Sequence, residues 1–299
     1  LIAKLITAIY FGAQKHSVQN QILFIGQLFS LLMVFILLNS TISSLLYFGI
    51  ALSFIPLFVL VMYNFFAFKG MFNEYKPQFK LFSLRRAKEV LGIGSRFFVI
   101  QFSMLILFST DNIIISQLFS PSEVVPYEIA RKYFSLLLHV FLVITTPYWS
   151  SFTEAYVKED INWIKNAVRR LLKIWCFIPL LLILMYFFSD YFYFIWVGDT
   201  VKVPKVMSLL MGSFVLLATF NTIFTQFLNG VGKIQMQMYS AVFSIFINIP
   251  LSVYFAKYTL LGVSGVILAT CISLIVYVIL RPIQYWKIVN KREKGVWSK

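Results

Sequence analysis

Long apolar stretches separated by short charged segments dominate this sequence. Between Ser17 and Phe68 there is no charged residue and no histidine. A helix that crosses a bilayer needs about 20 apolar residues, so this stretch is long enough for two spans. Because it is apolar on every helical face, we expect lipid or other membrane-embedded helices around it. The pattern predicts an all-α integral membrane protein.

The same pattern, followed along the whole chain, predicts eight full spans preceded by a partial helix in residues 1–12. Composition agrees, since 60% of the residues are hydrophobic and 12% are charged, whereas soluble domains carry about 25% charged residues. Mean hydropathy is +0.84. The predicted spans are 19–38, 43–66, 94–118, 126–148, 173–190, 206–228, 236–256 and 260–281.

The basic residues indicate how the spans are oriented. Most of the 26 Lys and Arg residues lie in segments that alternating spans place on one side: the linker after the second span, residues 151–172 and a C-terminal tail in which we count Arg281. The other side receives Lys202, Lys205 and Lys257. The positive-inside rule then predicts a cytoplasmic C-terminus. The net charge of +15 is explained by this topology and by attraction to anionic membrane lipids, and nucleic acid is not an expected partner.

Two segments on the basic side have the pattern of amphipathic helices, Phe82–Gly92 and Ala155–Leu172. In the second, the apolar residues would lie in the membrane interface and the basic residues would face lipid phosphates. Ordinary solvated connectors are the alternative. The apolar residues concerned are Trp163, Ile164, Val168 and Leu171.

An internal repeat relates the two parts of the chain. At one constant offset, Gly12 matches Gly230, Lys15 matches Lys233 and Gln19 matches Gln237, and each block is followed by two charge-poor spans. The repeat predicts a complete second half of six spans and a first half that lacks about 125 residues, for about 12 spans in total. The expected domains are the end of a first bundle (1–68), a basic linker (69–92), a second six-helix bundle (93–283) and a basic tail (284–299).

Several short motifs, in order along the chain, carry a resemblance to a known family. They are Phe108–Ser116, Pro126–Lys132, Thr145–Ser151, Phe227–Lys233 and Gly295–Lys299. With these motifs the sequence resembles the Wzx-type oligosaccharide flippases of the multidrug/oligosaccharidyl-lipid/polysaccharide exporter superfamily. The resemblance covers nearly the whole chain, apart from the helices expected before Leu1.

The resemblance implies a MATE-like transporter in which two six-helix bundles face a central cavity. Its implied activity is to move undecaprenyl-pyrophosphate-linked oligosaccharide repeat units from the cytoplasmic to the periplasmic leaflet, for O-antigen or other surface polysaccharide. It implies a bacterial inner membrane, alternating access driven by an H⁺ or Na⁺ gradient, and no bond-making chemistry. Polysaccharide polymerase and chain-length machinery would be the protein partners.

Charged residues at membrane depth are the main candidates for a site, because burying them is costly. Asp111, Arg131 and Lys132 are expected at similar depth on two antiparallel spans. One interpretation is an ion pair of Asp111 with Arg131 or Lys132. The other is a cationic lumen site for pyrophosphate or acidic sugars, which a guanidinium suits and the resemblance favours. Both hold if Asp111 releases Arg131 when substrate arrives. Glu128 is a further partner one turn away.

Three other groups of residues complete the candidates. Lys4, about 12 Å into its helix, either lines the cavity or reaches the cytoplasmic surface. Gln101 is a polar lumen candidate whose alternative role is interhelical hydrogen bonding, as for Asn248. By analogy with the superfamily, Asp111, Asn248 and Thr270 are candidates for a coupling-ion site.

Other functions fit the sequence less well. A multidrug or lipid II exporter on the same fold is the first alternative. A polysaccharide polymerase would need a large periplasmic loop, yet the longest outer loop is about 190–205. An acyltransferase would need a histidine or a carboxylate pair near the interface, but His139 lies in mid-span and His16 has no acidic neighbour. Neither a metal site nor a catalytic group is expected, and Cys176 and Cys271 lie in apolar runs.

Overall fold

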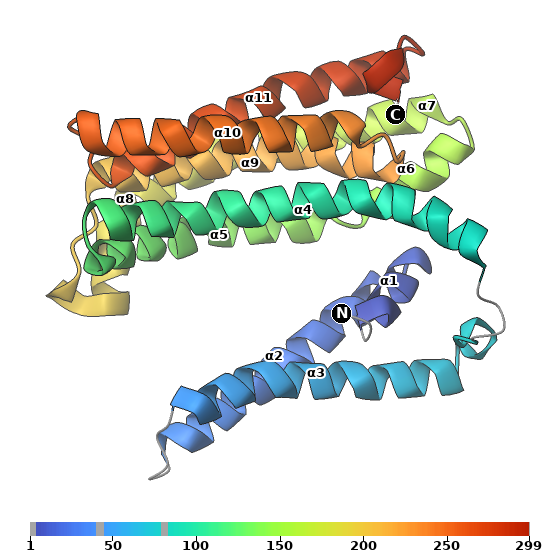
Figure 1. The fold of residues 1–299 in the computed structure, drawn as a ribbon, viewed down its shortest axis with the longest axis horizontal. Helices are drawn as coiled ribbons and strands as arrows, with labels where there is room; N and C mark the ends of the chain where they lie inside the picture. Colours follow the sequence, from blue (N-terminus) through green and yellow to red (C-terminus); the bar gives the residue numbers. More distant parts are fainter. Residues whose placement is uncertain (1–3, 40–44, 79–82, 299) are drawn as a thin grey trace. The chain divides into compact units, whose positions relative to one another are not determined.

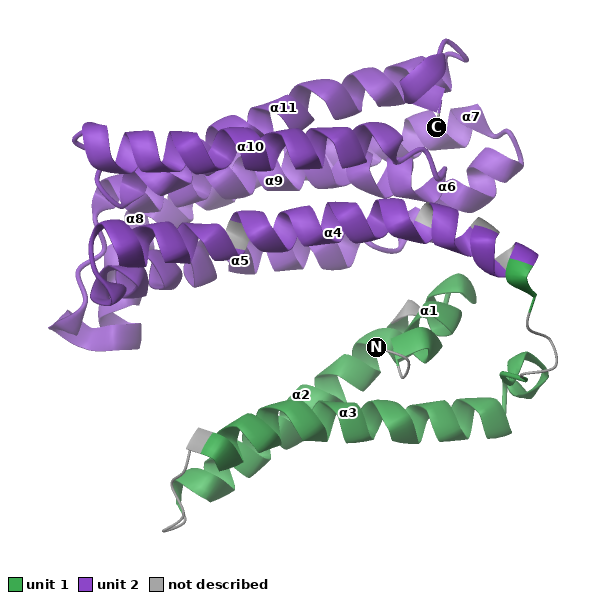
Figure 2. Ribbon diagram, in the orientation of Figure 1, with its two compact units in different colours: residues 1–84 green, residues 85–299 purple. Residues whose placement is uncertain are grey.

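The computed structural model describes residues 4–39, 45–78 and 83–298. Throughout these ranges the regular structure is helical, and eight helical segments are long and apolar enough to cross a membrane. The predicted fold class and number of spans are therefore confirmed. The chain forms two compact units, Leu1–Leu84 and Arg85–Lys299, which Figure 2 shows in different colours.

Unit 1 is built on two long helices that pack against each other. α2 (His16–Leu38) and α3 (Leu45–Lys69) approach closely where Gly26 faces Pro56, since a Cβ on Gly26 would lie 3.2 Å from the proline Cα. Nearby, Ser30 Oγ donates a hydrogen bond to the Ala51 carbonyl at 3.3 Å. The short helix α1 (Leu5–Gly12) precedes them, and the 3₁₀ turn η2 (Asn73–Tyr75) follows.

Unit 2 contains the remaining helices, which run back and forth so that successive long helices are antiparallel (Figure 1). α9 lies at its centre and packs against α5, α6, α8 and α11, while α10 packs along α11. The helices are α4 (Leu84–Leu118), α5 (Val124–Thr145), α6 (Tyr148–Val157), α7 (Ile161–Trp175), α8 (Ile178–Val197), α9 (Lys205–Gly230), α10 (Gln235–Tyr258) and α11 (Ser264–Val289), with 3₁₀ turns η4 (Pro121–Glu123), η5 (Gly198–Thr200) and η6 (Gly295–Ser298).

A close helix contact in unit 2 joins α6 to the end of α9. Gly230 lies against α6, because a Cβ at this position would be 2.7 Å from the Trp149 carbonyl oxygen. Thr153 Oγ1 donates a hydrogen bond to the Gly230 carbonyl at 2.8 Å, and the Phe152 and Phe227 rings meet edge to face at 5.4 Å. Gly230, one of the two glycines of the Phe227–Lys233 motif, therefore serves helix packing.

Helix boundaries differ from the prediction in three places. The span expected at 173–190 is α8, Ile178–Val197, which begins next to Pro179 and ends at Gly198, a residue with φ of +68°. α4 already begins at Leu84, so residues 84–92 are the first turns of a spanning helix; Phe82 lies outside the described residues. α11 continues to Val289, which places Arg281 inside a spanning helix and not in a tail.

The amphipathic segment expected at Ala155–Leu172 is divided between α6 and α7, with a turn at residues 158–160. Asp160 caps α7 by accepting a hydrogen bond from the Trp163 backbone N–H at 2.9 Å. Ile164, Val168 and Leu171 are buried in the core of unit 2. The prediction that they lie in the membrane interface is therefore wrong, because this apolar stripe is covered by protein.

Candidate functional site

Asp111 is at the centre of a buried hydrogen-bond network that joins four helices of unit 2. Its Oδ2 accepts hydrogen bonds from Tyr127 Oη on α5, at 2.8 Å, and from Thr270 Oγ1 on α11, at 3.3 Å. Asn248 Nδ2 on α10 donates to Thr270 Oγ1 at 3.1 Å. Asp111 and Asn248 are fully buried. The structure thus brings together Asp111, Asn248 and Thr270, the three residues selected as coupling-ion candidates.

Two oxygen atoms of this network lack a hydrogen-bond donor within the described residues, Asp111 Oδ1 and Asn248 Oδ1. A buried carboxylate without a compensating charge is expensive, so it is expected to bind a proton or a cation. Carboxylate, amide and hydroxyl oxygens are the ligands that hard cations prefer. Within the described residues, no three His, Cys, Asp or Glu side chains lie close enough together to hold a metal ion. The arrangement suits a proton or a single hard cation.

Sequence reasoning missed Tyr127, which makes the shortest hydrogen bond to Asp111. A signal for it was present. The connection between α4 and α5 is short, so residues at similar distances from the turn face each other in an antiparallel pair. The neighbouring contact obeys the same spacing, because Asn112 Nδ2 donates to Glu128 Oε1 at 2.9 Å.

Arg131 is paired with Glu128 and not with Asp111. Its Nε and Nη2 donate to the Glu128 carboxylate at 2.7–3.1 Å. The expected ion pair of Asp111 with Arg131 is therefore not formed in the described structure, since the one-turn spacing of Glu128 gives Arg131 a nearer carboxylate. The side chain of Arg131 is 39% exposed and Lys132 is exposed beside it.

The other lumen candidates lie elsewhere. Gln101 is exposed on α4, ten positions before Asp111. Lys4 belongs to unit 1, where it lines a cavity of about 560 Å³ together with polar side chains of α1, α2 and α3. These polar residues are Thr7, Gln19, Gln27 and Ser53.

Unit 2 contains a further charged residue at membrane depth, Arg281 on α11, which sequence reasoning had placed in a tail. It is 6% exposed, donates to Thr225 Oγ1 and lies over the Tyr277 ring at 4.6 Å. Its Nε has no hydrogen-bond partner among the described residues. The signal for its burial is the mainly apolar sequence that continues past it to Val289, interrupted by Gln284 and Lys287.

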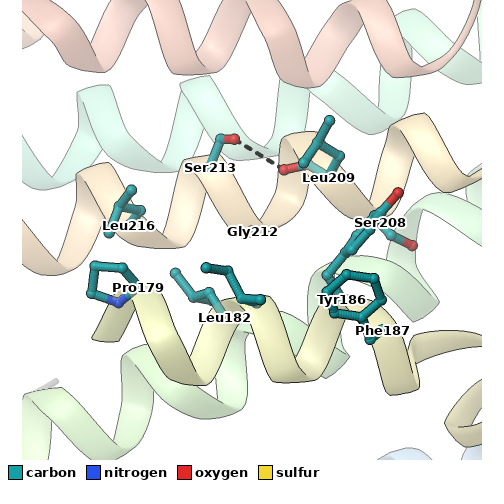
Figure 3. Close-up of a pocket in the computed structure, with 10 residues that line it drawn as sticks. Pro179, Leu182, Tyr186, Phe187, Ser208, Leu209, Gly212, Ser213 and Leu216 are labelled. Atoms are coloured by element: carbon teal, nitrogen blue, oxygen red, sulfur yellow. Dashed lines mark hydrogen bonds between the residues drawn. The ribbon is translucent and has the colours of Figure 1, made fainter. Parts of the chain in front are cut away.

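A groove of about 390 Å³ between α8 and α9 is almost entirely apolar (Figure 3). Ser208, Ser213 and Tyr186 bring hydroxyl groups to its lining, and Ser213 Oγ donates to the Leu209 carbonyl of its own helix at 3.0 Å. The groove shares no residue with the Asp111 network. It offers no ionic contact, so the candidate site remains the network around Asp111 with Arg131 one turn along α5.

Comparison with known proteins shows which family and which solved structures this chain is similar to. The MatE family model matches residues 97–254, more than half of the chain. A MATE protein crystallised in a straight conformation is similar with a TM-score of 0.76 and 15% identity, covering 97% of this chain and 66% of that one. An outward-facing multidrug resistance MATE transporter of the MOP superfamily is similar with a TM-score of 0.70 and 17% identity, covering 96% of this chain and 66% of that one.

The chain therefore spans just under two thirds of the length of these structures. No curated protein matches it. With a family model matched over most of unit 2 and the MATE fold in both units, the chain belongs to the MatE family.

Proposed function

We propose that this protein is a MATE-type transporter of the bacterial inner membrane that flips polyprenyl-pyrophosphate-linked oligosaccharide repeat units for surface polysaccharide assembly. One observation carries the proposal: Arg131 presents a partly exposed guanidinium at membrane depth. Glu128 engages its Nε and Nη2, and Nη1 has no partner among the described residues. A guanidinium held in this way offers N–H donors to a phosphate oxygen.

The pyrophosphate would compete with Glu128 for Arg131, and Lys132 adds a second cation beside it. Glu128 holds Arg131 in place when substrate is absent, so the cost of an isolated charge in the membrane is avoided. Lys4 and Gln101 are further candidates for contacts to the sugars. The protein forms and breaks no covalent bond in this proposal, and it works by alternating access.

The network of Asp111, Thr270 and Asn248 is proposed to bind the coupling ion, H⁺ or Na⁺. The supporting observation is the buried Asp111 carboxylate whose Oδ1 lacks a donor. Asn248 Oδ1, also without a donor, offers a second oxygen ligand. Asp111→Asn should keep the hydrogen bond from Tyr127 but abolish stabilisation by the ion. Thermal stability measured against Na⁺ concentration and pH tests this, and ion stabilisation that persists in Asp111→Asn would refute it.

Flipping is tested with the complete protein in proteoliposomes that contain a fluorescent polyprenyl-pyrophosphate oligosaccharide. Arg131→Ala should lower the flipping rate by about 10- to 100-fold, since hydrogen bonds to charged groups contribute about 1.5–3 kcal/mol. Arg131→Lys should retain part of the rate, and Lys173→Ala, an exposed cation on α7, should retain all of it. Wild-type flipping by Arg131→Ala, with normal insertion, would remove Arg131 from the mechanism.

A multidrug exporter is the second candidate, because one of the similar structures is a multidrug resistance transporter. In that case the coupling ion bound at Asp111 would be exchanged for a cationic drug, which the Asp111 carboxylate would attract. Drug accumulation in cells that express the protein separates the two functions, and glycosyltransferase genes beside the coding sequence would favour the flippase.

The proposed orientation has a cytoplasmic C-terminus, and the proposed partners are anionic lipids, polysaccharide polymerase and chain-length machinery. Unit 2 carries its basic helix α7 and the chain end at the same end of the bundle, which supports this orientation (Figure 1). Reporter fusion to the C-terminus tests it.

A further inference from the structure

A cavity of about 490 Å³ lies at the end of unit 2 where α7 meets the last turns of α11. Figure 1 shows these two segments at the same end of the unit. Its rim carries two cations, Lys165 and Arg169, one turn apart on α7. Neither has a carboxylate within ion-pair distance in the described part of the chain, because the ion pairs found there involve other cations. The rim is therefore positively charged and not neutralised by the protein.

The rest of the lining is mainly apolar, with Tyr285 and Asn290 as further polar members. Side chains of three helices line it, and they form a surface that suits hydrocarbon and not water. The lining includes Val168 and Leu172 of α7, Phe224 of α9, and Pro282 and Val289 of α11.

An exposed aromatic side chain also lines this cavity. Trp286 lines the cavity and is 51% exposed, and the Arg292 guanidinium lies over its ring at 5.4 Å. Tryptophan is enriched where membrane proteins meet the lipid headgroups, because its ring is apolar and its N–H is polar. The cavity is thus lined by two cations, an exposed tryptophan and several buried apolar side chains, which are the kinds of contact that a phospholipid can make.

The cavity at the opposite end of unit 2 has a different electrostatic character. It includes Lys202 and Lys205, but also Asp190 and Asp199. Lys205 already binds Asp190 at 2.7 Å. Of these two cavities, the α7–α11 cavity is the one whose lining carries cations and no carboxylate.

We propose that the α7–α11 cavity binds one anionic phospholipid, with its phosphate on Lys165 and Arg169 and an acyl chain against the apolar side chains. Basic pockets between spanning helices are suited to such headgroups. This site goes beyond the proposed transport function and does not depend on it, since lipid binding requires neither substrate nor coupling ion. Its effect would be to fix α7 against α11 in an anionic membrane.

The test uses the complete protein in neutral detergent, with lipid binding followed by native mass spectrometry. The probes are dioleoyl-phosphatidylglycerol and dioleoyl-phosphatidylcholine. The Lys165→Ala/Arg169→Ala variant should bind phosphatidylglycerol roughly 30-fold more weakly, about fivefold for each cation. The matched control, Arg170→Ala/Lys173→Ala, removes two exposed cations of the same helix that do not line the cavity and should change binding less than about threefold.

Three results would overturn the proposal. One is equal affinity for the two lipids. Another is an equal loss in both double variants, which indicates surface charge in general. The third is complete displacement of phosphatidylglycerol by millimolar inorganic phosphate, which would assign the cations to a free anion. The charge-preserving swap Lys165→Arg/Arg169→Lys should still prefer phosphatidylglycerol, and this keeps the test valid if the alanine variant does not fold.

Discussion

Tyr127 donates its phenolic hydrogen bond to the fully buried carboxylate of Asp111 at 2.8 Å, and this contact joins α5 to α4 in the middle of the candidate site. The bond satisfies one oxygen of Asp111 together with Thr270. It holds Asp111 in one orientation and leaves Oδ1 for another ligand.

Tyr127→Phe is expected to lower the free energy of unfolding by about 1–3 kcal/mol, because it removes a donor from a buried charged group. It should also weaken the stabilisation by Na⁺ or by protons that we propose for Asp111. Thermal unfolding in detergent, with and without Na⁺, measures both effects. Tyr133→Phe is the matched control, because Tyr133 lies on the same helix as Tyr127 but donates to the Met185 carbonyl of α8 at 3.1 Å. Equal loss of ion stabilisation in both variants would contradict a specific role of Tyr127.

Gly230→Ala is expected to destabilise unit 2 by about 1–3 kcal/mol, since the new methyl group would meet the backbone of α6. Gly12→Ala is its control, because Gly12 is the matching residue of the predicted repeat and a Cβ there meets nothing within 4 Å. Melting temperatures of the two variants in the same detergent compare them. A similar shift for both would show that backbone flexibility, and not close packing, explains the effect.

Arg281→Met should retain the stability of the wild type or increase it, since Met keeps much of the side-chain volume and removes a buried charge that has no carboxylate partner among the described residues. Arg281→Glu should be strongly destabilising, because it buries a carboxylate beside Thr225 and Tyr277. Protein yield and melting temperature report both. If Arg281→Met instead unfolds, Arg281 has a stabilising partner outside the residues described. Loss of transport with stability intact would place Arg281 in the mechanism.

An ion pair between Lys233, in the turn from α9 to α10, and Glu293, which follows α11, makes the stability of the folded state depend on pH. Lys233 donates to Glu293 at 2.9 Å. Burial raises the pKa of Glu293, but the hydrogen bond from Lys233 and its charge outweigh this, so the pKa is lowered overall. A carboxyl group whose pKa is lower in the folded than in the unfolded state stabilises the folded state when the pH is above the unfolded-state pKa. This stabilisation is lost as the pH falls through the folded-state pKa.

We therefore expect the wild type to lose more stability than Glu293→Gln when pH is lowered from 7 to 3, by up to about 1 kcal/mol for a single ion pair near the surface. Thermal unfolding at both pH values measures the difference. Glu159→Gln is the control, since Glu159 forms only a long, exposed contact with Lys291 at 3.5 Å. Identical acid sensitivity of wild type and Glu293→Gln would contradict the prediction.

The sequence by itself determined the membrane class and the number of spans, because the hydrophobic requirement of a bilayer is met by length and composition alone. It also identified Asp111 as the acidic residue at membrane depth, since charges are rare there. The choice of Asn248 and Thr270 as its neighbours came from family resemblance, and the hydrogen bonds from Asn248 to Thr270 and from Thr270 to Asp111 bring the three together.

Only the tertiary structure decided which partner each polar group has. Helical periodicity states which residues share a face, but not which face meets which helix. Two partners were open for Arg131, Asp111 on the preceding helix and Glu128 one turn away on its own helix, and in the structure it pairs with Glu128. For the apolar stripe of α7 the membrane interface was one of two interpretations, and the stripe packs in the core. Arg281 was placed in a tail because a cation near the end of an apolar run commonly marks the end of a spanning helix. The residues after it pack against the bundle, so the helix continues to Val289. Interhelical contacts between distant segments settle these alternatives.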